Sequence, residues 1–303
     1  MKIEDSFEIS NENQHYLSLL NVAEKQSHRT RWQRLVSMPV RMVLPVVFRS
    51  SGLQSFMSYK TFWGGSFRGL IPEDVSTLIW RQKYFDAAVC RALLSVLGKG
   101  GVFIDVGSHF GFFTLLASKV VGSSGTVLAV EPMPNTYKQL KINISKHAAH
   151  KNVCSFNVAG HNCEQQLTFK DFGYLNSSLN THHHSRAQSN RAANNFKNVE
   201  VNAKKIDQVV DASQVNRVDL IKIDAESSEL AVIEGALETL ERYRPKIVVE
   251  VSGMTEEVAA KSRQVLEVLF SAGYKAWRWK EENLEEVNDE LPADYDNYFF
   301  IPI

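Results

Sequence analysis

Short apolar runs alternate with segments of helical periodicity from about residue 85 to residue 303. The runs predicted to form strands are 101–106, 126–132, 153–159, 218–226, 245–251, 274–280 and 296–303. The segments with apolar residues at helical spacing are 84–97, 112–122, 135–147, 230–243 and 256–273. This alternation predicts an α/β fold with a mostly parallel, seven-stranded sheet and helices on both faces. Ligands in such sheets bind beyond the carboxyl ends of the strands, so we expect the chemistry there.

The charge balance limits the class of substrate, and the cysteine content indicates the cellular compartment. Lys plus Arg and Asp plus Glu both total 34, so no overall positive field attracts nucleic acid, and a polynucleotide substrate is disfavoured. Cys90, Cys154 and Cys163 form no CxxC pair, which suits a reducing compartment. The first 28 residues lack the basic start and apolar run of a signal peptide, so the cytoplasm is the expected location.

The stretch FIDVGSHFGFFTLL, residues 103–116, has the pattern of a strand, a glycine turn and a helix. A dinucleotide-binding fingerprint that begins at Gly107 would need glycine where His109 and Phe112 stand, so it fails at two of its three positions. An NAD-linked Rossmann oxidoreductase is weakened by this failure but stays as an alternative.

The same turn fits the pattern acidic-x-Gly-x-Gly-x-Gly of S-adenosylmethionine-dependent methyltransferases at Asp105, Gly107 and Gly111. We expect the two glycines to let the backbone approach the methionine part of the cofactor, and Asp105 to hold its ammonium directly or through water. His109 takes the place of the middle glycine and is expected to have positive φ, which histidine tolerates better than most residues. Glu131 ends the next strand, 26 residues after Asp105, where a carboxylate can accept both ribose hydroxyls.

Taken together, these motifs and a third one at the fourth strand resemble the FkbM family of methyltransferases. Such proteins show D-x-G-(A/S)-(N/H)-x-G, then E-P, then K-x-D-x-E-G-x-E. The matching residues here are Asp105, Gly107, Ser108, His109, Gly111, Glu131, Pro132, Lys222, Asp224, Glu226 and Glu229. Ser227 departs from the pattern, because the family usually has glycine there. Glycine adopts positive φ freely, so the departure concerns the backbone shape of the turn after Glu226.

The resemblance covers roughly residues 60–300 and implies a class I methyltransferase (Rossmann-like) fold in residues 81–303, after an N-terminal helical extension of residues 1–80. It implies S-adenosylmethionine as cofactor, bound by the first two motifs and Asp224. It also implies transfer of a methyl group to oxygen, commonly a hydroxyl of a sugar, polyketide or other secondary metabolite. A methyltransferase fold that kept its cleft but lost turnover is the second alternative.

The candidate catalytic residues lie at the carboxyl edge of the sheet. Asp224 is the first candidate for base or substrate anchor, with a cofactor or structural contact as its alternative, and Glu226 is the second candidate. His109 would place an imidazole of near-neutral pKa at the lip of the cofactor site, as a further base or only as part of the turn. Glu229 begins the next helix and either functions or caps that helix.

Lys222 lies inside an apolar strand and is expected to pair with Asp224 or Glu250, with no catalytic role. Asp224, Glu226 and Glu250 could together hold Mg²⁺, which prefers oxygen ligands. No tighter motif supports a metal, so a magnesium site is not favoured.

A polar insert of 26 residues, 173–198, separates the third and fourth strands. It is predicted to be a lid or an acceptor-binding loop, or else a surface loop. Side chains that would bind a polyol are Tyr174, Asn176, Ser177 and Asn180. The tract His182, His183 and His184 points in several directions and favours a solvated loop over a metal site.

Two N-terminal segments are also distinctive. Residues 29–50 contain five arginines, no acid and a short apolar run, so they either lie on a membrane surface, meet an acidic partner, or pack as a helical extension. The run is too short to span a bilayer. Residues 62–86 contain Trp63, Trp80 and Tyr84, which either cover the cofactor pocket or belong to the core.

Overall fold

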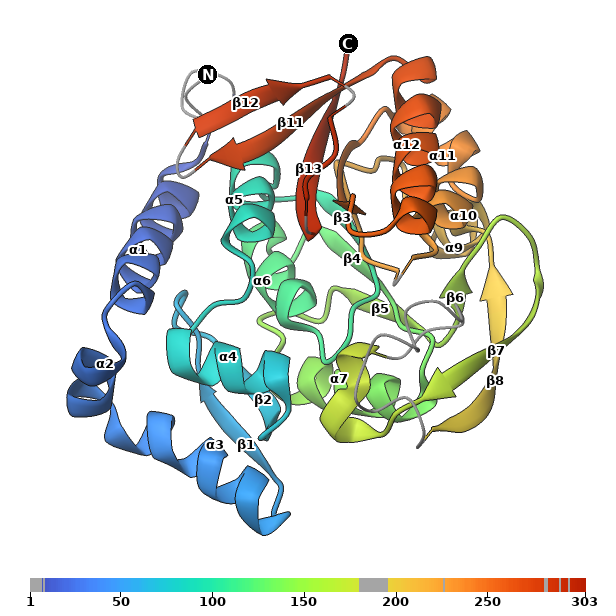
Figure 1. Ribbon diagram of the computed structural model, residues 1–303. Coiled ribbons are helices and arrows are strands. Elements are labelled where there is room, and N and C mark those ends of the chain that lie inside the picture. Colours follow the sequence, from blue (N-terminus) through green and yellow to red (C-terminus); the bar gives the residue numbers. More distant parts are fainter. Residues whose placement is uncertain are drawn as a thin grey trace.

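The computed structural model describes residues 7, 9–179, 196–225, 227–280, 283–288, 290–293 and 295–303. An eight-stranded sheet forms the centre of this part of the chain, with helices on both faces (Figure 1). In spatial order its strands are β12 (Asn283–Val287), β11 (Tyr274–Lys280), β13 (Tyr295–Pro302), β10 (Lys246–Ser252), β9 (Leu220–Ile223), β3 (Val102–Val106), β4 (Thr126–Val130) and β5 (Val153–Phe156).

The sheet is mostly parallel, as predicted. β10, β9, β3, β4 and β5 run parallel to one another, and β13 joins β10 in antiparallel register. The sheet differs from the prediction in having eight strands rather than seven. The additional strand is β12, which pairs with β11 as an antiparallel hairpin at the edge, with Ala276 opposite Val287.

Two layers of helices cover the sheet. On one face lie α5 (Ala87–Val96) and α6 (Phe112–Val121), next to α7 (Pro134–His147). On the other face lie α9 (Ile206–Ser213), α10 (Glu229–Glu234), α11 (Leu237–Tyr243) and α12 (Glu256–Ser271). Successive residues of a strand point to opposite faces of the sheet. Phe103 packs with side chains of α5 and α6, and Ile104 packs with side chains of α9 to α12.

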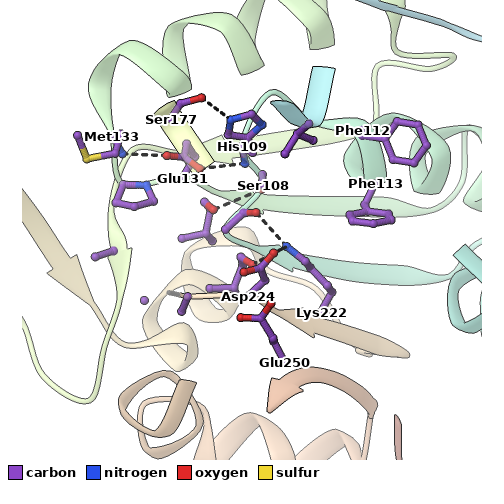
Figure 2. Close-up of a pocket in the computed structure, with 18 of the residues that line it drawn as sticks. Ser108, His109, Phe112, Phe113, Glu131, Met133, Ser177, Lys222, Asp224 and Glu250 are labelled. Atoms are coloured by element: carbon purple, nitrogen blue, oxygen red, sulfur yellow. Dashed lines mark hydrogen bonds and ion pairs between the residues drawn. The ribbon is translucent and has the colours of Figure 1, made fainter. Parts of the chain in front are cut away.

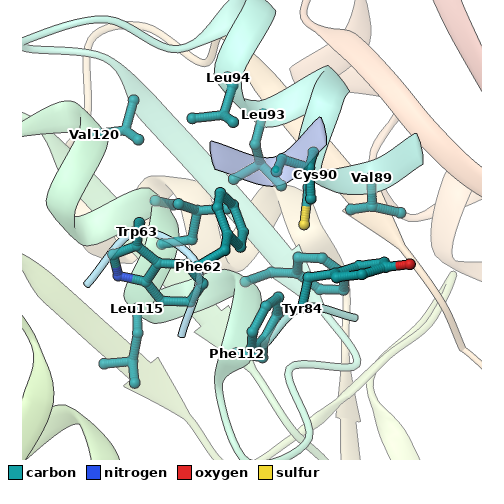
Figure 3. Close-up of a cluster of buried hydrophobic side chains, with 14 of the residues drawn as sticks. Phe62, Trp63, Tyr84, Val89, Cys90, Leu93, Leu94, Phe112, Leu115 and Val120 are labelled. Carbon is teal, nitrogen blue, oxygen red and sulfur yellow. The ribbon is translucent and has the colours of Figure 1, made fainter. Parts of the chain in front are cut away.

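The first layer contains a dense aromatic core, which Figure 3 shows between α5 and α6. Trp63, Trp80 and Tyr84 are all buried in it, and the Trp63 ring meets Phe112 edge-on at 5.0 Å between centroids. These three aromatic residues therefore belong to the core rather than to the cavity described below.

The N-terminal extension is not entirely helical. It comprises α1 (Asn11–Ser27), α2 (Arg31–Ser37), α3 (Pro39–Ser51), an antiparallel hairpin of β1 (Ser55–Lys60) and β2 (Ser66–Ile71), and α4 (Asp74–Gln82). The Asn13 amide nitrogen on α1 donates to the carbonyls of Leu94 and Leu97 at 2.9 and 2.7 Å, which ties α1 to the end of α5.

The polar insert lies beside a second, three-stranded sheet. Its strands are β6 (Ala159–Gly160), β8 (Lys197–Lys204) and β7 (Gln165–Asp171), in that order. The insert begins with a 3₁₀ helix, η2 (Tyr174–Leu179), and its last two residues start β8. Asn180 and the tract His182, His183 and His184 lie outside the described residues.

The helix predicted over 230–243 is two helices, α10 and α11, separated at Gly235. A Cβ at Gly235 would overlap the carbonyl oxygen of His161, so the backbone at Gly235 lies directly against the backbone at His161. The Asp207 carboxylate then accepts hydrogen bonds from the Glu238 and Thr239 amides, which starts α11 independently.

We predict that Gly235→Ala lowers the free energy of unfolding by about 1–3 kcal/mol, because the added methyl group has no space beside His161. Urea unfolding followed by circular dichroism measures the change. Gly98→Ala is the matched control, since nothing lies within 4 Å of a Cβ built there. Equal losses in the two variants would contradict the close approach at Gly235.

Candidate functional site

A cavity of about 360 Å³ lies at the carboxyl ends of β3, β4, β9 and β10, the edge predicted to carry the chemistry. Figure 2 shows Glu131, His109 and Ser177 on one side of it and Lys222, Asp224 and Glu250 on another. Apolar walls come from the N-terminal extension, from the segment between α4 and α5, and from β7. They include Phe67, Val75, Ile79, Phe85, Leu167 and Phe169.

The glycine turn packs against the chain that leaves β9. Gly107 has φ 74°, and a Cβ there would overlap the carbonyl oxygen of Asp224. His109 has φ 50°, so the predicted positive φ at this position is present. Gly111 has φ 91° and begins α6, but it does not line the cavity. Close packing of backbone on backbone therefore accounts for the glycine at 107 as well as any ligand would.

Lys222 is the buried cation at the centre of the site. Its Nζ donates to the Gly107 carbonyl at 2.9 Å and lies 3.3 Å from Asp224 Oδ2 and 3.7 Å from Asp105 Oδ1. The predicted pairing with Asp224 is thus present, and Asp105 is a second partner. Burial alone would lower the pKa of Lys222, but the two carboxylates outweigh it and the pKa is raised.

Asp105 does not line the cavity, and its contact with a cofactor ammonium, directly or through water, stays a prediction. It is completely buried, and its Oδ2 accepts a hydrogen bond from the Thr114 hydroxyl at 2.6 Å. Oδ1 has no hydrogen-bond partner among the described residues and is compensated by Lys222. Burial raises the pKa of Asp105, and Lys222 opposes that shift. Asp105 therefore positions Lys222, and sequence patterns gave no signal for Thr114.

Glu131 presents a carboxylate to the other side of the cavity. Its Oε2 accepts from the His109 amide at 2.9 Å and its Oε1 from the Met133 amide at 3.0 Å. Burial raises the pKa of Glu131 to about 7, although both amides oppose the shift. Each oxygen keeps a further lone pair, so the group can accept two more hydrogen bonds from a ligand.

Ser108 and Pro132 complete the two motifs at the cavity wall. The Ser108 hydroxyl donates to the Asp105 carbonyl at 2.7 Å, which closes the turn. The Asn157 amide nitrogen donates to the carbonyls of Glu131 and Pro132 at 2.9 and 2.8 Å, which fixes the chain after β4. The two segments are therefore held independently of any ligand.

His109 is held inside the site rather than at its lip. Its Nε2 lies 2.8 Å from the Ser177 hydroxyl, and its ring stacks on Phe110 at 4.1 Å between centroids. Burial lowers the pKa of His109 to about 4, so the near-neutral value expected from the sequence is wrong. The imidazole is uncharged at neutral pH and is a weak base.

The start of the polar insert reaches the cavity through Ser177. Tyr174 packs edge-on against Phe56, 5.8 Å between centroids, and does not line the cavity. The side chain of Asn176 and all of Asn180 lie outside the described residues. Of the four predicted acceptor-binding residues, the structure thus brings Ser177 to the site.

Asp224 lines the cavity, and its side chain is 34% exposed. Glu226 lies outside the described residues. Glu229 is buried and its Oε1 accepts from the Ala225 and Ser227 amides at 3.0 and 3.1 Å, which favours the capping alternative. Ser227 has φ 77°, so the turn keeps the positive φ that glycine adopts more easily.

Glu250 lines the cavity on the side of Asp224 and Lys222 (Figure 2). Among the residues that the structure describes, no group of three or more His, Cys, Asp and Glu side chains could hold a metal ion. Glu226, one of the three magnesium ligands considered, is not among those residues, so the magnesium site, which the sequence did not favour, is not tested by the structure.

The sheet, the glycine turn and the acid after β4 together define a class I methyltransferase fold. Residues 105–276, more than half of the chain, match the methyltransferase FkbM domain. The chain therefore belongs to the FkbM methyltransferase family, which confirms the resemblance of its motifs. No curated protein matches the chain.

Several solved structures have similar folds. Methyltransferase FkbM from Methylobacillus flagellatus is 14% identical with a TM-score of 0.43, covering 69% of this chain and 46% of that one. Aeropyrum pernix fibrillarin with natively bound S-adenosyl-L-methionine is 12% identical with a TM-score of 0.41, covering 71% and 73%. A Thermotoga maritima SAM-dependent O-methyltransferase is 13% identical with a TM-score of 0.38, covering 82% and 78%. The chain thus spans less than half the length of the Methylobacillus protein.

We predict that Lys222→Met lowers the free energy of unfolding by about 3–5 kcal/mol, because Asp105 is left buried without its cation. Adding Asp105→Asn to that variant is expected to recover at least half of the loss, since the uncompensated acid is then absent. Urea unfolding of the single and double variants gives the coupling free energy. Additive losses in the double variant would contradict the pairing.

Proposed function

We propose that this protein transfers a methyl group from S-adenosylmethionine to a hydroxyl of a small molecule. The observation that carries the proposal is that Glu131 and Asp224, which directly follow β4 and β9, present carboxylates to one cavity on either side of the glycine turn. Membership of the FkbM methyltransferase family supports the same activity.

The residues of the cavity fit an S-adenosyl nucleotide. Glu131 has two free acceptor positions, which suits a ribose diol, and its carboxylate is already oriented by two amides. The backbone at Gly107 and Ser108 lines the wall between Glu131 and Asp224, where Gly107 adds no side-chain bulk. A cavity of about 360 Å³ is within the range of small-ligand sites. When bound, S-adenosylmethionine supplies an electrophilic methyl group on a sulfonium.

Asp224 is the residue best placed to prepare the acceptor. Its carboxylate is partly exposed to the cavity and is held by Lys222 at 3.3 Å, so it can accept a hydroxyl proton and orient the oxygen. His109 is less available as a base, because its Nε2 is engaged with the Ser177 hydroxyl at 2.8 Å. We assign His109 to holding the insert over the cavity.

The balanced charge of the chain supports an uncharged or weakly charged acceptor such as a sugar or secondary metabolite rather than a nucleic acid. Cys154 and Cys163 are exposed free thiols, which supports a reducing compartment, and we propose the cytoplasm. Within the described ranges, no helix is both long and apolar enough to cross a lipid bilayer.

We predict that Asp224→Asn lowers kcat at least about 100-fold and leaves the affinity for S-adenosylhomocysteine within about threefold, because the carboxylate acts on the acceptor. Transfer of labelled methyl groups to a panel of hydroxylated metabolites measures kcat, and calorimetry measures the affinity. His109→Asn is the matched control and is expected to keep most of the activity, since asparagine also tolerates positive φ.

Full activity in Asp224→Asn would remove this residue from the chemistry. If S-adenosylhomocysteine binds but no acceptor is methylated by the unaltered protein, the cavity belongs to a binding module that has lost turnover.

We also predict that the affinity for S-adenosylhomocysteine falls as the pH drops below about 7, by up to tenfold per pH unit. Glu131 is protonated below its pKa in the free protein, whereas ribose hydroxyls donate to its ionised form, so binding must release a proton. Titration calorimetry between pH 5.5 and 8 is expected to show this slope, and Glu131→Gln is expected to bind weakly without it. A slope that persists in Glu131→Gln would assign the proton to another group.

A further inference from the structure

Helices α2 and α3 carry a row of apolar side chains on their outer side that no described residue covers. Trp32 and Val36 on α2 are 76% and 81% exposed, and Val40, Val43 and Val47 on α3 are 64%, 47% and 46% exposed. The spacing of three or four residues places them along one side of the two helices. In Figure 1 these helices project from the lower left of the molecule, away from the main sheet. A contiguous apolar row of this kind on a surface marks a contact site.

Helices α2 and α3 also carry several arginines and no acid. Residues 29–53 contain five arginines and no Asp or Glu. Arg31, Arg34 and Arg49 lie near enough to Arg81 of α4 to lower the pKa of Arg81, after the larger effect of its burial. Asp74 pairs with Arg49 at 2.5 Å. The face therefore keeps an excess of positive charge around an apolar centre, and only an anionic occupant with an apolar interior complements both.

A cleft of about 650 Å³ lies between α3 and α4, behind the apolar row. Its walls are formed by α3 and α4, with Pro45, Val46 and Leu78 as apolar lining and Arg49 and Arg81 as cations. Val75 and Phe85 line both this cleft and the site cavity, so the two spaces adjoin. The site cavity thus lies behind a wall that it shares with the cleft, on the α3–α4 side of the molecule.

We propose that the α2–α3 face docks on an anionic lipid surface, with the apolar row entering the headgroup region and the arginines meeting lipid phosphates. Tryptophan and arginine are the side chains suited to that depth, and the helices are too short to go further. The α3–α4 cleft then opens beside the bilayer. The acceptor class that follows, an amphiphile with a hydroxyl that is held in the membrane, rests on the proposed methyl transfer, whereas the docking itself does not.

Co-sedimentation of the full chain with vesicles tests the docking. We expect binding to phosphatidylcholine vesicles that contain phosphatidylglycerol, weaker binding to phosphatidylcholine alone, and loss of binding in high salt. Val36→Asp combined with Val43→Asp is expected to weaken binding at least about tenfold. Leu237→Asp is the matched control, since Leu237 is a 45% exposed apolar residue on α11, across the molecule. Trp32, the most exposed tryptophan, is expected to shift its fluorescence to shorter wavelength on binding.

Circular dichroism and S-adenosylhomocysteine affinity, both expected to be unchanged in the double variant, separate a docking defect from misfolding and from failure of the proposed function. Absence of vesicle binding by the unaltered protein would overturn the proposal. It would also be overturned if the unaltered protein is a dimer that the double variant converts to a monomer, because a second copy of the chain would then cover the face.

Discussion

The buried lysine at the centre of the sheet is the interaction on which the site depends. Lys222 is 3% exposed, and it joins the ends of two strands, β3 and β9, by contacting Asp105, Asp224 and the Gly107 carbonyl. A buried cation is tolerated only when its charge and its donors are satisfied, so the glycine turn, Asp105 and Asp224 must all keep their places. Asp105 is paired with Lys222 and does not line the cavity. Asp224 is left partly exposed, which makes it the one of these two acids that is available to a ligand.

The other elements build outward from that centre. Glu131 is oriented by backbone amides, independently of the lysine, so the two sides of the cavity are fixed by separate interactions. The hairpin and α4 of the N-terminal extension supply an apolar wall through Phe67, Val75 and Ile79, and η2 adds Ser177. The extension is therefore part of the site as well as the carrier of the exposed α2–α3 face.

Sequence patterns predicted the α/β class, the positions of the main strands along the chain and the family, because each rests on local periodicity or on motifs of fixed spacing. They did not predict what depends on distant contacts. The break at Gly235 follows from the approach of His161, and the pKa of His109 near 4 follows from its burial under η2. The pattern also suggested a ligand contact for Asp105, whereas burial beside Lys222 gives it a structural partner. Residue types identified the candidate acids, and only three-dimensional contacts distinguished the exposed Asp224 from the buried Asp105.

The central claim is that the cavity between Glu131 and Asp224 is shaped for an S-adenosyl nucleotide. Titration calorimetry of the full chain with S-adenosylhomocysteine, with NADH as the matched nucleotide, tests this most directly. Saturable binding of one S-adenosylhomocysteine per chain, lost in Glu131→Ala and absent with NADH, is the predicted result. Binding of NADH without binding of S-adenosylhomocysteine would contradict the account and favour an oxidoreductase.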